Sequence, residues 1–280
     1  MSGTSAVRVG GQALADGVFM RTDRAWAIAR EDGSLTTGAM PPRRWAKVPV
    51  VRVLAGMASA LRLAVGRGML GRGSGAGGSV TGRRRNRRVL VTMVAVEISA
   101  VFVSHAAGGL TWPVVGTAAR VAGPWVAAFA VLRAVAPKSL WRYHGAEHKA
   151  VAAHEAGVDL GHVEAVLACP RVHDRCGTNL VFLAMLGGTV LSWVPAALQV
   201  PAFLVLLAGA AEVVSAAAGH PRARASRLVL AGGRALQRRV TTAEPSFAQQ
   251  AVGCRALAAC LEHHDRLAPG ASPPSVASAA

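Results

Sequence analysis

The chain has 280 residues, of which 52% are hydrophobic, and it carries a formal net charge of +17. The apolar residues gather in four blocks with the charges outside them, which is typical of membrane spans and argues against one mixed soluble core. Because the arginines cluster beside these blocks, the charge indicates a basic cytoplasmic side, and we expect the lipid bilayer as partner and no nucleic acid.

The N-terminal region, residues 1–47, is expected to form a small β element. Two short apolar runs, Val18 to Met20 and Ala25 to Ala29, alternate with turn residues such as Asp32-Gly33. The region lacks the charged start and apolar run of a secretory signal peptide. Residues 48–65 predict an amphipathic or interfacial helix, and the Gly- and Arg-rich residues 66–88 a flexible linker.

Two transmembrane hairpins are predicted, at residues 89–136 and 180–220. Their four helices run over about 89–110, 113–136, 180–198 and 200–218, each near the roughly 20 residues that a bilayer crossing requires. Arginines precede the first helix and follow the second and fourth, whereas the turns at 106–113 and 196–201 carry no arginine or lysine. This asymmetry predicts a multi-pass inner-membrane protein with both termini in the cytoplasm. A soluble helical bundle with buried hairpins is the alternative.

Three charged residues, Glu97, Arg120 and Glu212, lie within or beside these spans. An unpaired charge there is costly, so Glu97 and Arg120 are expected to pair, unless both reach the interface.

Residues 221–267 are expected to form cytoplasmic helices. A basic helix over 222–239 would lie near anionic headgroups, and a second helix over 246–267 would follow the break at Glu244-Pro245. The Pro- and Ser-rich residues 268–280 predict a disordered tail.

The cytoplasmic segment 137–179 contains five of the nine histidines. Its sharpest pattern is His144-x-x-Glu147-His148, the inverted form of a zinc-protease motif. On a helix, residues four apart share a face, so both imidazoles can bind one ion, and Glu147 could serve as general base. Glu155 is expected on the same face. The alternative is a helix start whose side chains form surface ion pairs.

A second cluster places His173 three residues before Cys176. Zinc accepts both ligand types, and a catalytic zinc site needs three protein ligands and one open position. We therefore expect a divalent metal, with zinc favoured, held by His144 and His148 and completed by His173, Cys176 or Glu155. The alternative is that Cys176-Gly177 starts a helix and His173 bonds locally. The four cysteines predict no disulfide framework.

Three strings point to a known family: Gly10 to Arg21 (GGQALADGVFMR), Tyr143 to Lys149 (YHGAEHK) with the residues up to Gly177, and Thr241 to Pro245 (TTAEP). With them the chain resembles the YqhQ-like family of uncharacterised membrane proteins, a domain of unknown function regarded as a predicted metal-dependent enzyme. The resemblance covers nearly the whole chain and implies paired transmembrane hairpins around a cytoplasmic His-rich segment. Asp16 stands where the family usually has Glu, His154 replaces an aromatic residue, and Asp174 adds a negative charge beside the expected metal.

Three functions remain open. The first is a membrane-embedded metal-dependent hydrolase, in which Glu147 activates water and Gln12, Asp16, Arg21 or Glu244 provide substrate or structural contacts. The second is a non-catalytic assembly or scaffold factor with a structural metal or polar cluster. The third is a transporter or channel subunit, which four spans would support only in a homo-oligomer. The sequence names no substrate and leaves the oligomeric state open.

Overall fold

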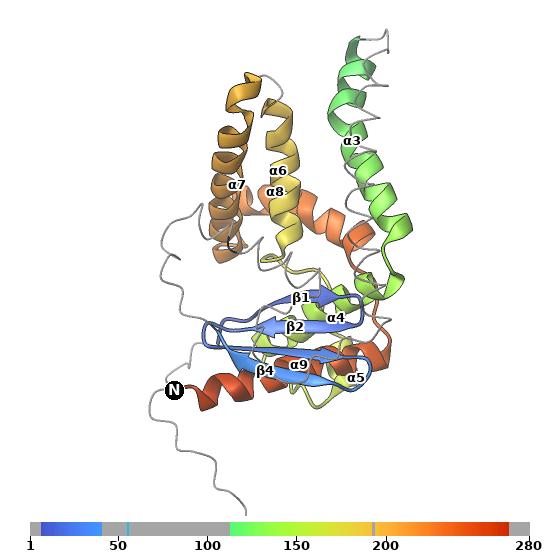
Figure 1. The fold of residues 1–280 in the computed structure, drawn as a ribbon, viewed down its shortest axis with the longest axis vertical. Coiled ribbons are helices and arrows are strands. Elements are labelled where there is room, and N and C mark those ends of the chain that lie inside the picture. The colour runs from blue at the N-terminus through green and yellow to red at the C-terminus, as the bar shows by residue number, and fades with distance from the viewer. Residues whose placement is uncertain (1–6, 41–54, 56–112, 192–193, 269–280) are drawn as a thin grey trace, which may run out of the picture. The chain divides into compact units, whose positions relative to one another are not determined.

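The computed structural model describes residues 7–40, 55, 113–191 and 194–268 (Figure 1). The chain divides into two compact units. The first combines Met1–Arg43, Ser139–Val172 and Thr242–Ala280, and the second combines Arg44–Lys138 and His173–Thr241. Each unit is therefore built from segments that are far apart in the sequence.

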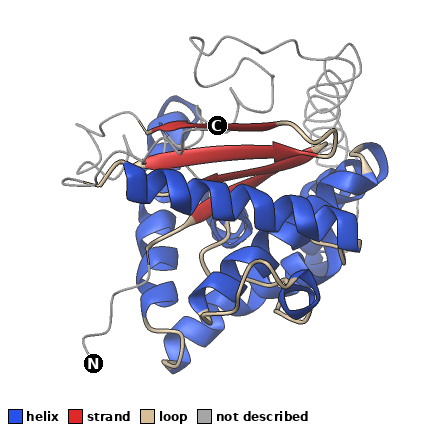
Figure 2. Cartoon of the chain, turned by 90° about the horizontal axis from the view of Figure 1, so that it is seen from below, coloured by secondary structure: helices blue, strands red, loops and turns tan. Residues whose placement is uncertain are grey.

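The first unit contains an antiparallel sheet (Figure 2). It has four strands in the order β1-β2-β3-β4. The strands are β1 (Gly10–Leu14), β2 (Gly17–Arg21), β3 (Ala25–Arg30) and β4 (Leu35–Ala39). Gly33 lies in the turn between β3 and β4 with a φ of 89°, a backbone conformation that residues with a side chain rarely adopt. The predicted N-terminal β element is thus confirmed.

The register of the sheet separates its two faces. Met20 lies opposite Gly11 and Ala27, while Val18 lies opposite Ala13 and Ala29, so these side chains share one face. That face is buried against two helices, α4 (Lys138–Glu155) and α9 (Phe247–Arg266), which contribute Tyr143, Ala150, Ala256 and Leu257 to the same core, among others. Burial of this apolar face holds the unit together.

Helices α4 and α9 approach each other closely. The backbone oxygen of Ala146 accepts a hydrogen bond of 3.1 Å from the side-chain amide of Gln250, and Gly253 leaves room for the same oxygen. Ser246 begins α9 with a capping box that it shares with Gln249. A short helix, α5 (Val163–Leu167), packs on α9 through Val166.

The second unit is helical in the part that the structure describes. It contains α3 (Pro113–Val135), α6 (Gly177–Leu191), α7 (Ala196–Gly219), α8 (Arg224–Leu236) and a short π-helix, η1 (Gln237–Thr241). Helices α6 and α7 lie side by side, and α8 packs on both of them (Figure 1). Two glycines make this packing possible, since Gly187 lies against Leu206 and Gly233 against Asn179.

One described helix, Ala197–Gly219, is long and apolar enough to cross a membrane, with a mean hydropathy of 2.0. A shorter apolar helix at Gly123–Val135 falls within the second predicted span, and another at Gly177–Gly187 overlaps the start of the third. The first predicted span, the linker at 66–88 and most of the tail lie outside the described residues, and so does the predicted helix at 48–65 except for Ala55. A mainly helical chain with a small N-terminal sheet is therefore confirmed, whereas four spans stay a prediction.

Candidate metal centre

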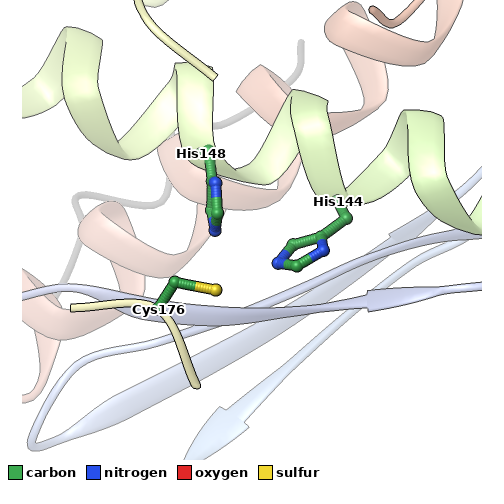
Figure 3. A group of neighbouring side chains, drawn as sticks. All are labelled: His144, His148 and Cys176. Atoms are coloured by element: carbon green, nitrogen blue, oxygen red, sulfur yellow. The ribbon is translucent and has the colours of Figure 1, made fainter. Parts of the chain in front are cut away.

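Helix α4 carries the two histidines of the inverted motif on one face. His144 and His148 are four residues apart in the sequence, and the centroids of their rings are 4.4 Å from each other. The two side chains are shown in Figure 3. His148 is only 3% exposed, while His144 is half-buried. The helix spacing therefore brings the two imidazoles together as the sequence predicts.

A backbone carbonyl fixes the orientation of His148. Its Nδ1 lies 2.7 Å from the carbonyl oxygen of Arg171. Because a carbonyl oxygen only accepts hydrogen bonds, Nδ1 carries the hydrogen, and in the neutral ring Nε2 then keeps its lone pair. Histidines that bind metals typically show this arrangement, with one ring nitrogen donating to a fixed acceptor and the other binding the ion.

Glu147 lies beside both rings and is 7% exposed. Its Oε2 is 4.0 Å from Nε2 of His144 and also 4.0 Å from Nε2 of His148. These distances are too long for direct hydrogen bonds, and they suit a water or an ion held between the three groups. Strand β1 makes room for this carboxylate, since a Cβ at Gly11 would lie 2.7 Å from its Cγ and from Oε1.

A thiol joins the histidine pair. One ligand atom from each of His144, His148 and Cys176 lies within 4.8 Å of the others, so the three could hold a metal ion (Figure 3). Cys176 precedes helix α6, and its sulfur accepts a hydrogen bond of 3.4 Å from the backbone N–H of Thr178. Two imidazoles and one thiolate match the ligands of zinc sites that keep a fourth position open.

Two of the five predicted metal ligands are not in this group. The ring of His173 turns to its own loop, where Nδ1 accepts from the backbone N–H of Arg175 at 3.3 Å. Glu155 is exposed at the last residue of α4, and eleven residues of helix separate it from His144 by about 16 Å along the axis. Sharing a helix face does not overcome that distance, so Glu155 cannot ligate the same ion as His144.

The predicted substrate contacts lie elsewhere in the sheet. Gln12 pairs with Phe19, and Arg21 pairs with Gly10, which places both on the face opposite Gly11 and Glu147. Asp16 forms an ion pair of 2.7 Å with Arg30 next to the β1–β2 turn, which the shorter Asp side chain can reach. A role of these three residues in substrate binding stays a prediction.

Residues that the sequence did not single out surround Glu244. Its carboxylate accepts a hydrogen bond of 2.8 Å from Nε of Arg171 and forms an ion pair of 3.1 Å with Lys149. Asp174, which the sequence placed as an added charge beside the metal, accepts hydrogen bonds of 2.6 and 2.7 Å from Nε and Nη2 of Arg234. This contact raises the pKa of Arg234, and the Asp174 carboxylate is paired with the Arg234 guanidinium. The strings YHGAEHK and TTAEP contain Lys149 and Glu244 of the first network, but nothing in the sequence pointed to Arg171.

One family model matches the part of the chain that carries most of this site. Residues 125–263 match the model of a family described as a protein of unknown function (DUF1385). The matched segment includes α4, Cys176 and the TTAEP string, whereas the N-terminal GGQA string precedes it. No curated protein and no solved structure matches the chain. The match supports a domain of unknown function, and the finer resemblance to the YqhQ-like family stays a prediction.

Proposed function

We propose that the protein is a metal-dependent hydrolase anchored in the cell membrane, with zinc bound by His144, His148 and Cys176. The observation that carries the proposal is the position of Glu147, whose Oε2 lies 4.0 Å from Nε2 of both histidines. In that position the carboxylate can accept a proton from a water placed next to the ligand nitrogens.

Each residue of the proposed site has its own chemical role. Bound zinc would supply an acidified water and an electrophile that polarises the scissile bond. Glu147 would serve as the general base that accepts a proton through Oε2, and it could pass that proton to the leaving group. His148 presents Nε2 because its Nδ1 donates to Arg171, and the tight fit against Gly11 limits the movement of the Glu147 carboxylate.

Anchoring in the bilayer is supported by the second unit. Helix α7 is long and apolar enough to span a bilayer, and it exposes large apolar side chains such as Leu198, Val200 and Val205. Exposed apolar surface of this kind suits contact with lipid. Only four residues separate α7 from α8, whose exposed arginines, Arg224 and Arg227, suit anionic headgroups of the cytoplasmic leaflet.

Metal analysis of the purified full-length protein tests the proposal. We expect about one zinc per chain, lost on His148→Ala and retained on His162→Ala, which changes an exposed histidine of the α4–α5 connection. Glu147→Gln should keep the metal and lose hydrolysis of a peptide or ester library by at least about a hundredfold. A wild-type protein that binds no zinc after reconstitution would contradict the proposal.

A structural metal in a non-catalytic factor is the second candidate. It is favoured by the same 4.0 Å distances, because a small movement would let Glu147 become a fourth ligand and close the site. In that case Glu147→Gln would weaken zinc binding as strongly as His148→Ala does. The two candidates therefore differ in the metal content of one variant. The predicted pairing of Glu97 with Arg120, on which a transport function depends, involves Glu97, which lies outside the described residues.

A further inference from the structure

We propose that Glu244, Arg171 and Lys149 form a positioning network that holds His148 with its Nε2 turned toward the metal. The inference rests on the proposed metal site and adds residues from the C-terminal TTAEP string to it. All the contacts that carry it lie within the first unit.

The network acts through the backbone of Arg171. Its carbonyl oxygen accepts the Nδ1 hydrogen of His148 at 2.7 Å, so any shift of Arg171 turns the imidazole or changes its tautomer. The loop that contains Arg171 is non-helical, and it follows the short helix α5. Backbone of this kind depends on side-chain contacts to keep one position.

The side chain of Arg171 is held at both ends of its guanidinium. Nε donates to Glu244 at 2.8 Å, and Nη1 donates to the Oγ1 of Thr242 at 2.8 Å. The planar guanidinium fixes its partners in direction as well as distance. The TTAEP string thus sets the place of the carbonyl that orients His148.

Lys149 also binds the backbone of the same loop. Its Nζ donates to the carbonyl oxygens of Leu167 at 2.6 Å and Cys169 at 2.9 Å, and it lies 3.1 Å from Glu244. These three acceptors match the three N–H bonds of a lysine ammonium group. Because Lys149 directly follows His148 on α4, it ties the loop to the residue that the loop orients.

Glu244 is exposed, so its substitution can test the positioning role without unfolding the protein. Its side chain is 65% exposed, and ion pairs of exposed groups add little to stability. We therefore expect Glu244→Gln to fold and to affect mainly the orientation of His148. Glu262→Gln is the matched control, since Glu262 is 71% exposed and pairs with Arg266 on α9.

Two measurements on the full-length protein test the network. Competition with a chromogenic chelator should show zinc binding weakened about tenfold in Glu244→Gln, restored in part by Glu244→Asp, and unchanged in Glu262→Gln. In the metal-free protein, the imidazole nitrogen signals of His148, assigned by their loss in His148→Ala, should show hydrogen on Nδ1. Glu244→Gln should shift that population toward Nε2.

The tautomer measurement keeps the two proposals distinguishable. A wild-type protein that binds no zinc contradicts the metal site, yet the tautomer of His148 still reports whether Glu244 controls it. An unchanged tautomer population in Glu244→Gln overturns the network, and so does a zinc affinity equal to that of the Glu262→Gln control.

Discussion

At the scale of single residues, Gly11 packs closely against Glu147 of the site. A Cβ there would meet Glu147 at 2.7 Å, whereas a Cβ at Gly10 would meet only the end of Arg21 at 3.9 Å. We expect Gly11→Ala to lower the free energy of unfolding by about 1–3 kcal/mol and to reduce activity, because the carboxylate must move. Gly10→Ala should change stability by no more than about 0.5 kcal/mol. Thermal unfolding of both variants checks this, and equal effects would contradict the close packing of Glu147 on β1.

The four cysteines should differ in reactivity. Burial raises the pKa of the Cys260 thiol to about 12 and also raises that of Cys254. Since the thiolate is the reactive form, both should resist alkylation at pH 8, while the half-buried Cys169 and Cys176 react. Zinc should then protect Cys176 and leave Cys169 reactive. Mass spectrometry of the labelled peptides measures this, and equal labelling of Cys176 with and without zinc would speak against its role as ligand.

The buried Cys260 thiol also makes stability depend on pH. Its folded-state pKa of about 12 lies above the value of about 8.5 of a free thiol, so the unfolded chain loses this proton first. The free energy of unfolding is therefore insensitive to this group below about pH 8.5 and falls as the pH rises toward 12. Denaturant titrations of wild type and Cys260→Ala check this, and the variant should lose that part of the decline.

At the scale of elements, α8 presents two different faces. Leu230 is fully buried, and Leu228, two residues earlier, is 77% exposed beside Arg224 and Arg227. We expect Leu230→Ala to destabilise the protein by about 2–5 kcal/mol. Leu228→Ala should cost no more than about 0.5 kcal/mol, because its side chain packs on little protein.

The exposed face of α8 should respond to lipid charge. In vesicles, Leu228→Cys, with Cys169 and Cys176 changed to serine, should react more slowly with a water-soluble thiol reagent when the lipid is anionic than when it is zwitterionic. Glu262→Cys on the exposed side of α9 serves as the control. Equal rates in both lipids would show that α8 does not lie on the headgroups.

Elements with a strong local signal could be predicted from sequence. The spacing of His144 and His148 and the break at Glu244-Pro245 both depend on neighbours within a few residues, and both helices are present. Glu155 was predicted as a ligand because it lies on the same helix face as His144. That prediction did not take into account the rise of about 1.5 Å per residue along the helix axis, which places the two side chains too far apart. Arg171 could not be predicted, because its contacts to His148, Thr242 and Glu244 span 23 to 73 positions.

At the scale of the whole molecule, the order of the segments in the sequence does not indicate which of them pack together. The sheet, α4 and α9 form one core, although more than ninety residues separate α4 from each of the other two. Contacts of this range are decided by which apolar faces fit together, which periodicity alone does not encode. The second unit is inserted into the first twice. Its helices α6 and α7 lie in the region of the predicted hairpin, but α6 ends at Leu191 and α7 begins at Ala196, so the predicted turn at 196–201 lies inside α7. Helix α8 lies within the predicted basic helix at 222–239.

The direction in which α7 crosses the membrane is the last prediction. Arg222, Arg224 and Arg227 follow this helix, while the turn before it at Val194-Pro195 carries no charge. Because basic residues remain on the cytoplasmic side, Pro195→Cys should be labelled by an impermeant maleimide added to intact cells. Arg222→Cys should be labelled only after the cells are made permeable. Labelling of both positions from the same side would mean that α7 does not span the bilayer, and the anchoring of the proposed hydrolase would then need another explanation.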